Sequence, residues 1–137
     1  MEKVIEINSL DELDKVAQAV IDSLAGRTVV ALDAPMGAGK TTLVGRIARL
    51  LGAEDDVTSP TFAIVNQYEG VRTIYHFDMY RIERVEEALD FGSEEYLSSG
   101  ELCLVEWPEK IEALLPDDTM VVKIEILSES ARRFVIR

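Results

Sequence analysis

The chain has 137 residues, 47% of them hydrophobic, which fits a single domain, residues 1–137, with a buried core. Its 26 acidic residues outnumber its 14 basic residues and give a net charge of −12, which argues against nucleic-acid binding through the overall electrostatic field. The sequence has no apolar run long enough for a membrane span, no signal-peptide core and one cysteine, Cys103, so an internal disulfide is excluded and a cytoplasmic location is the simplest expectation.

The first part of the chain predicts a strand, a helix and a second strand. Residues 3–7 alternate in polarity like a short strand. Ser9, followed three residues later by Glu12, fits a capping box that opens a helix, and Gly26 ends that helix. The apolar residues 29–32 then predict a buried strand.

The segment Gly37-Ala38-Gly39-Lys40-Thr41-Thr42 is the most informative about function. It follows the second predicted strand and leads into a helix, extending to about Gly52, whose apolar residues share one face. This order of strand, glycine-rich loop with Lys-Thr, and helix is typical of a phosphate-binding loop. In such a loop the backbone N–H groups and the helix N-terminus attract phosphates, Lys40 reaches the β- and γ-phosphates, and Thr41 offers its hydroxyl to Mg²⁺.

The match to the phosphate-loop pattern has one departure. The pattern places a glycine six residues before the lysine, where this chain has Ala34, followed by Pro35 and Met36. Pro35 has no backbone N–H and restricts the entry turn of the loop, but the donors of the following glycine-rich segment remain. The alternative is a plain strand-to-helix turn with a surface lysine.

The remaining elements add strands to the predicted sheet. Residues 62–68 and 73–77 flank a turn and predict a hairpin, and residues 102–106 predict a second buried strand that includes Cys103. Further expected elements are strands at 119–127 and 132–136, short helices at 84–91 and 109–115, a turn at 93–97 and a polar connection at 54–61. The alternation of strands and helices implies an α/β layer structure, and the added antiparallel hairpins make its sheet mixed.

Two carboxylates are candidates to complete a nucleotide site. Asp78 ends the predicted strand 73–77, and Glu106 ends the strand at 102–105. The carboxyl ends of strands are where α/β folds bind their ligands. One carboxylate could hold Mg²⁺ while the other orients or activates water, and the sequence leaves open which does which. Each could equally be an ordinary strand-end carboxylate in so acidic a chain.

Several other features have more than one interpretation. Residues 58–62, Thr-Ser-Pro-Thr-Phe, could form a switch loop that contacts Mg²⁺ and the γ-phosphate, or a simple proline turn. Trp107, the only tryptophan, could line a nucleotide pocket or pack in the core, and His76, the only histidine, is expected to be structural. Arg81 and Arg84 could neutralise phosphate charge or remain solvated beside the many glutamates. The sequence has no Asn-Lys-x-Asp segment for reading guanine, which favours ATP.

Four motifs make the chain resemble the TsaE (YjeE) family, the small P-loop ATPases of bacterial threonylcarbamoyl-adenosine tRNA modification. These motifs are Gly37–Thr42, Thr58–Phe62, Tyr75–Arg81 and Val105–Lys110, in the order and spacing of the family. The resemblance extends over essentially the whole sequence. The departure lies at residues 34–36, where the family usually has Gly, an acidic residue and Leu.

The resemblance implies an α/β fold of the P-loop NTPase-like kind, a three-layer sandwich with a central mixed sheet. It also implies an ATPase that cooperates with a partner pair, TsaB and TsaD. That pair moves threonylcarbamoyl from an adenylate onto the adenosine next to the anticodon of tRNAs that read codons beginning with A. By similarity, Lys40, Thr41 and Thr42 contact ATP, and Thr41 and Glu106 hold Mg²⁺. Asp78, Thr61 and Trp107 match functionally important positions of the family. Arg132 or Arg133 lies against the adenine.

The function expected from the sequence is therefore an Mg²⁺-dependent ATPase whose hydrolysis resets a tRNA-modifying complex. The partners would carry the tRNA, in keeping with the net charge of −12. Slow turnover of the chain alone is expected, because no arginine is placed unambiguously to act as an arginine finger. Two alternatives stay open, a small-molecule kinase, for which the chain leaves little room for a lid, and a nucleotide-dependent switch that signals by docking.

Overall fold

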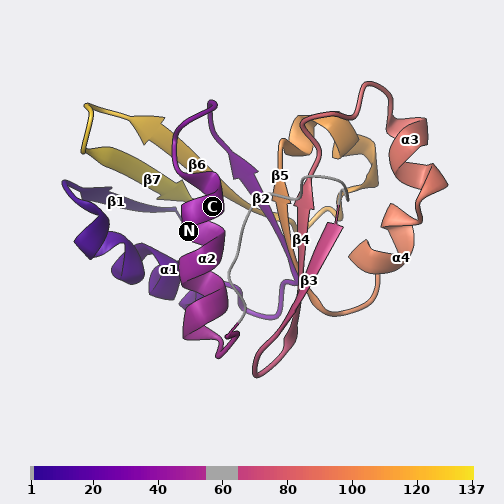
Figure 1. Ribbon diagram of the computed structural model, residues 1–137, viewed down its shortest axis with the longest axis horizontal. Helices are drawn as coiled ribbons and strands as arrows, with labels where there is room; N and C mark the ends of the chain where they lie inside the picture. Colours follow the sequence, from indigo (N-terminus) through magenta and orange to yellow (C-terminus); the bar gives the residue numbers. More distant parts are fainter. Residues whose placement is uncertain (1, 55–64) are drawn as a thin grey trace.

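A computed structural model of the protein describes residues 2–54 and 65–137. Within these residues the strands form one mixed seven-stranded sheet in the order β1-β7-β6-β2-β5-β4-β3 (Figure 1). The strands are β1 (Lys3–Ile7), β2 (Val29–Asp33), β3 (Val65–Glu69), β4 (Thr73–Asp78), β5 (Leu102–Glu106), β6 (Met120–Ile126) and β7 (Arg132–Ile136). The expected α/β fold with a mixed central sheet is confirmed.

The centre of the sheet is parallel, and both of its sides end in antiparallel pairs. β2 pairs in parallel with β5 and with β6, and β4 pairs in parallel with β5. β3 pairs antiparallel with β4 on one side, and β6, β7 and β1 form antiparallel pairs on the other. β2 and β5 are buried over most or all of their length, as their apolar sequences predict. The carboxyl ends of β2, β4 and β5 therefore meet at one edge of the sheet, where a ligand site is expected.

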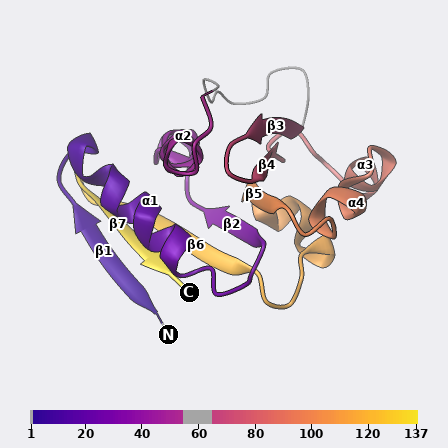
Figure 2. The same cartoon turned by 90° about the horizontal axis from the view of Figure 1, so that it is seen from below.

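Helices cover both faces of the sheet and complete three layers. One face carries α1 and α2, and the opposite face carries α3, α4 and the 3₁₀ helix η2 (Figure 2). The bounds are η1 (Leu10–Glu12), α1 (Leu13–Asp22), α2 (Lys40–Leu50), α3 (Val85–Asp90), α4 (Ser93–Leu97) and η2 (Pro108–Leu114). Among the helices of residues 2–54 and 65–137, none has the length and apolar character that a membrane crossing requires.

Successive side chains of β4 and β5 point to opposite faces of the sheet, and this alternation determines which of them face α2. Ile74 of β4 and Leu104 of β5 belong to the core beneath α1 and α2. Because side chains two positions apart on a strand share a face, His76 and Asp78 follow Ile74 on this side, and Glu106 follows Leu104. Asp78 pairs in register with Glu106 across the two strands. Three polar side chains thus gather on the α2 face near the carboxyl ends of neighbouring strands.

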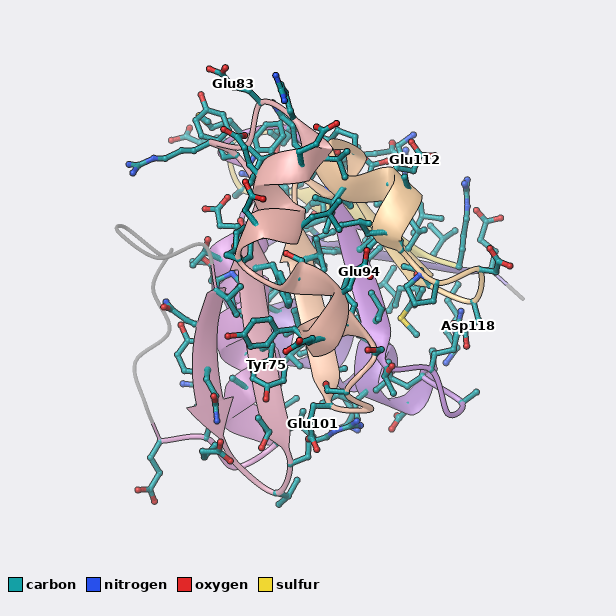
Figure 3. All side chains as sticks on the ribbon, turned by 90° about the vertical axis from the view of Figure 1, so that its right-hand side faces the viewer. Tyr75, Glu83, Glu94, Glu101, Glu112 and Asp118 are labelled. Atoms are coloured by element: carbon teal, nitrogen blue, oxygen red, sulfur yellow. The ribbon has the colours of Figure 1, made fainter. Side chains whose placement is uncertain are left out.

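The opposite face of the sheet carries an aromatic cluster beneath an acidic surface. Tyr75 of β4 meets Tyr96 of α4 edge to face, with ring centroids 4.9 Å apart, and Phe77 meets the same ring at 5.8 Å. Figure 3 views this layer from outside, with Tyr75 beside the short helices and the exposed Glu94 and Glu112 among the outer side chains. This face therefore supplies packing, and its solvent side contributes to the negative charge of the protein.

Three local predictions differ from the structure. The helix expected to open at Ser9 begins as the 3₁₀ turn η1, and α1 ends at Asp22, before the positive-φ residue Gly26. The turn expected at 93–97 is the short helix α4, because five residues are too few for a helical period to be visible in the sequence. The helix expected at 109–115 is of 3₁₀ type, starts at a proline and contains one residue with non-helical φ and ψ.

The Glu12 half of the expected capping box is present. The Glu12 carboxylate accepts hydrogen bonds from the backbone N–H groups of Asn8 at 2.6 Å and Ser9 at 3.3 Å. The Asn8 bond, followed by the contact with the Lys15 ammonium and the weaker Ser9 bond, lowers the pKa of Glu12, because each of them favours its ionised form. The carboxylate therefore pairs the N–H of Ser9, the residue that caps the start of the helix, and that of Asn8 just before it.

Candidate active site

The phosphate loop joins β2 to α2, and its backbone conformation explains two of its glycines. Gly37 and Gly39 have φ values of +82° and +100°, a region that other residues enter only with strain. A Cβ at either position would meet no heavy atom within 4 Å, so conformation rather than space selects glycine. Gly39 directly precedes the first residue of α2, so the loop leads into a helix N-terminus, whose N–H groups attract anions.

The side chain of Lys40 lies inside the site. The residue is only 6% exposed, its Nζ donates to the carbonyl oxygen of Ala34 at 3.0 Å, and the same atom lies 3.6 Å from the ring centroid of Trp107. Ala34 contributes through its backbone, so the missing glycine does not remove this bond. Burial lowers the pKa of Lys40, and the nearby carboxylates, led by Glu106, oppose that shift. Lys40 is therefore not the surface lysine of an ordinary turn.

Glu106 is the centre of a buried hydrogen-bonded group. The residue is 3% exposed, and its Oε2 accepts a hydrogen bond from Oγ1 of Thr41 at 3.1 Å. The same Oε2 lies 2.5 Å from Nε2 of His76, which is fully buried. Thr41 is the second residue of α2, so this contact joins the phosphate loop to the end of β5. His76 was expected to be structural. Its position two residues before Asp78 on one strand is the sequence feature that predicts both side chains on the same face of the sheet.

The oxygen donors at this point fit Mg²⁺. Mg²⁺ usually keeps several waters and binds through one or two carboxylates together with substrate phosphates. Thr41 and Glu106 bring a hydroxyl and a carboxylate to within hydrogen-bond distance of each other. In residues 2–54 and 65–137, no group of three or more His, Cys, Asp or Glu side chains is placed to hold a metal ion by itself.

A cavity of about 350 Å³ opens beside these residues. It is lined by Met36, Gly37, Gly39, Lys40, Thr41, Thr42, Asp78, Tyr80, Glu106 and Trp107. Asp78 is half-buried, and its Oδ1 accepts the backbone N–H of Tyr80 at 3.1 Å. Met36 and Tyr80 are exposed lining residues that no sequence motif marks as site residues, although each lies within two positions of a predicted one.

Trp107 lines the cavity with an unusual backbone conformation. Its φ and ψ are +57° and +53°, a left-handed conformation that costs a residue other than glycine about 1–2 kcal/mol. Its ring lies against Lys40 and has its centroid 5.1 Å from that of Tyr80. Strain of this kind clusters at functional sites. The structure supports both interpretations of Trp107, because the residue lines the cavity and also packs against the core cluster on the face of α3 and α4.

A second cavity of about 520 Å³ lies on the other side of the loop and shares Gly39 and Thr42 with the first. Ala38 and Arg132 line this cavity and not the first one. The Nε of Arg132 donates to the Ala38 carbonyl at 3.3 Å, and its Nη1 donates to the Ser128 carbonyl at 2.7 Å. The remaining lining residues are mostly apolar and come from both ends of the chain: Ile7, Ser9, Leu10, Leu13, Glu129, Ser130 and Phe134.

The other arginines considered from the sequence lie elsewhere. Arg133 forms ion pairs with Glu6 and Glu125, so Arg132 is the one of the two that reaches the second cavity. Arg81 and Arg84 are exposed and are not among the residues that line either cavity. Thr61 and the rest of segment 58–62 lie outside the described residues.

Comparison with known proteins gives a consistent family. Residues 7–134 match the family described as "Threonylcarbamoyl adenosine biosynthesis protein TsaE". The chain is similar to the tRNA threonylcarbamoyladenosine biosynthesis protein TsaE of Treponema pallidum, at 34% identity over 80% of this chain and 81% of the relative. It is also similar to the TsaE proteins of Rickettsia felis, at 37% identity over 92% and 74%, and Bacillus subtilis, at 40% over 76% and 65%.

A solved structure gives the same result in three dimensions. The crystal structure of Bacillus subtilis YdiB superposes with a TM-score of 0.76 and 28% identity, covering 99% of this chain and 84% of that one. The family match, the relatives and the fold agree with the motifs that line the two cavities. The chain belongs to the TsaE family of threonylcarbamoyl adenosine biosynthesis proteins.

Proposed function

We propose that the chain is an Mg²⁺-dependent ATPase that acts in the threonylcarbamoyladenosine modification of tRNA. The observation that carries the proposal is the convergence of Lys40, Thr41, Asp78 and Glu106 on one cavity beside the phosphate loop. These residue types, in this order of strand, loop and helix, bind phosphates and Mg²⁺ in P-loop enzymes. Membership of the TsaE family supports the tRNA modification as the process that the ATPase serves.

The two cavities suggest how a nucleotide would lie. Its phosphates would occupy the first cavity, where Lys40 and the N–H groups at the start of α2 attract negative charge. Its adenosine part would occupy the second cavity, which is largely apolar and bordered by Arg132. Because Gly39 and Thr42 line both cavities, one nucleotide can extend across the loop from one to the other.

The residues of the first cavity would divide the chemistry. Thr41 and Glu106 would hold Mg²⁺, which neutralises charge on the β- and γ-phosphates when it is bound. Lys40 would offset the negative charge that develops on the γ-phosphate during transfer. Oε2 of Glu106 is already engaged by Thr41 and His76. Asp78 is half-buried at the cavity wall, so we assign the orientation of the attacking water to Asp78.

The protein would work with TsaB- and TsaD-like partners, as the family resemblance implies. A chain with a net charge of −12 is poorly suited to hold tRNA itself, so the partners would carry the tRNA. No arginine lines the first cavity within the described residues, which supports a slow intrinsic rate of hydrolysis. ATP hydrolysis would then reset the complex for the next round of modification.

The test reconstitutes threonylcarbamoyl transfer to tRNA with the TsaB and TsaD partners, ATP and Mg²⁺. The chain is present, absent, or carries Lys40→Ala, and ATP hydrolysis is measured in the same samples. Lys123→Ala is the matched control, because Lys123 is exposed on β6 and lines neither cavity. We expect repeated turnover to need the chain, to be lost in Lys40→Ala and to persist in Lys123→Ala.

Other outcomes would favour the alternative functions. Equal cycling of the partners without the chain would overturn the proposed role. Full support of the partners by an Asp78→Asn variant that binds ATP without hydrolysing it would favour a nucleotide-dependent switch. Transfer of the γ-phosphate to a small acceptor instead of water would favour a kinase.

A further inference from the structure

We infer that His76 is a positioning residue for Glu106, holding its carboxylate in the orientation that Mg²⁺ binding requires. The inference rests on the proposed function, since it takes Glu106 as a metal ligand. It assigns a role to a side chain that touches neither cavity and that the sequence alone marks as structural.

The topology of the sheet brings the two side chains together. β4 and β5 are parallel neighbours, and His76 pairs in register with Leu104. Glu106 lies two residues beyond Leu104 on the same face, which makes it the diagonal neighbour of His76. His76 is fully buried, Glu106 is 3% exposed, and Nε2 of the imidazole lies 2.5 Å from Oε2 of the carboxylate.

The hydrogen bond with Glu106 is the polar contact that the described residues make with the His76 imidazole. A carboxylate accepts hydrogen bonds, so the hydrogen lies on Nε2 of His76. Nδ1 is buried, and no described residue forms a hydrogen bond with it. Here the polar contact of the ring is directed at the one carboxylate assigned to the metal.

The consequence for Glu106 is a fixed orientation. Its Oε2 is shared between His76 at 2.5 Å and Thr41 Oγ1 at 3.1 Å, while Oε1 lies 3.4 Å from the same hydroxyl. Anchoring one oxygen restricts rotation of the carboxylate beside Thr41. Hydrogen-bond partners of this kind orient metal ligands, and their loss weakens metal binding by about 10–100-fold in known sites.

The experiment measures Mn²⁺ binding to the ADP complex by electron paramagnetic resonance, with ADP affinity in the presence of chelator measured separately. We expect His76→Leu to weaken Mn²⁺ binding about 10-fold or more and to leave metal-free ADP affinity unchanged. His76→Gln, whose terminal amide can donate from nearly the position of Nε2, should restore Mn²⁺ binding. A purely structural histidine would not separate the two affinities or show this rescue.

Two further variants keep the outcome interpretable. Ile74→Val, two residues earlier on the same face of β4, loosens the core without removing a polar contact and should leave Mn²⁺ affinity unchanged. If His76→Leu does not fold, His76→Asn replaces it. The shorter amide overlies Nδ1, cannot reach Glu106 and should cause the same loss.

Glu106→Gln separates failure of this inference from failure of the proposed function. If Glu106→Gln weakens Mn²⁺ binding but folded His76→Leu and His76→Asn do not, the positioning role of His76 is overturned and the metal role of Glu106 stands. If Glu106→Gln also binds Mn²⁺ like the wild type, the metal role itself is wrong and the inference falls with it.

Discussion

The ammonium of Lys40 lies 3.6 Å from the centroid of the Trp107 ring, so the only tryptophan of the chain covers the lysine of its phosphate loop. The contact joins the start of α2 to the residue that follows β5. A cation over an indole face is attracted by the ring electrons. A phosphate that binds Lys40 competes for the same charge and alters the surroundings of the ring.

Nucleotide binding should therefore change the fluorescence of Trp107. Titration of ADP into the wild-type protein is expected to shift the emission intensity or wavelength. Lys40→Ala removes both the cation over the ring and a phosphate ligand, so its emission should stay flat. Tyr80→Leu removes a neighbouring ring but keeps the cation, and should retain a response. Unchanged wild-type emission while calorimetry detects bound ADP would contradict this prediction.

Nucleotide affinity should fall as the pH rises, and the fall should begin at a lower pH than it would if Lys40 were an exposed lysine. Burial lowers the pKa of Lys40 below its ordinary value of 10.5, so the free protein loses this proton at a lower pH. The uncharged amine attracts phosphate less. The dissociation constant for ADP, measured upward from about pH 7.5, where the phosphates are already ionised, should rise with pH. Lys40→Arg, if it binds ADP, should show a flatter profile because guanidinium stays charged. A pH-independent wild type would count against a charged Lys40 in binding.

Cys103 should be chemically silent in the folded protein. The residue is fully buried, and burial raises the pKa of its thiol from 9.0 to about 12. Iodoacetamide at about pH 8 should label the denatured chain and spare the native one, as mass spectrometry would detect. Because the unfolded thiol ionises first, this residue should also lower the free energy of unfolding as pH rises from 9.0 towards 12. Rapid labelling of the native protein would contradict the buried position.

Ala25 should be a position where glycine stabilises the fold. Its φ is +49°, it is exposed, and it lies between the end of α1 and β2. Ala25→Gly removes the left-handed strain of about 1–2 kcal/mol and adds entropy to the unfolded chain, for a net gain of up to about 1 kcal/mol. Ala19→Gly, inside α1, is the opposed control and should cost about 1 kcal/mol. Chemical denaturation measures both, and destabilisation by Ala25→Gly would contradict the strain argument.

The sequence was sufficient to predict those parts of the site that come from one continuous segment or from the end of a single strand. The strand, loop and helix around Lys40 are predicted from one continuous segment, and the structure has them in that order. Asp78 and Glu106 could be paired because each ends an apolar strand, and the register brings them opposite each other. Their functional roles remain predictions.

The parts that were missed depend on which distant segments become neighbours. His76 meets Glu106 only because β4 lies beside β5, a fact of sheet order that neither strand's sequence contains. The second cavity combines Leu10 and Leu13 with Phe134 near the other end of the chain, so no local sequence motif predicts it. Met36 and Tyr80 resemble ordinary exposed apolar residues until the cavity around them is known.

Because β1 pairs with β7, a nucleotide bound at the proposed site would also stabilise the end of the sheet that these strands form. β1 and β7 run antiparallel over their full lengths, Lys3 opposite Ile136 and Ile7 opposite Arg132. The second cavity includes Ile7 from β1 and Arg132 and Phe134 from β7. An adenosine seated there would contact both the edge strand β1 and its neighbour β7, and would slow the fraying of β1 from the sheet. Amide hydrogen exchange in β1 and β7 would then report occupancy at a distance from the phosphates.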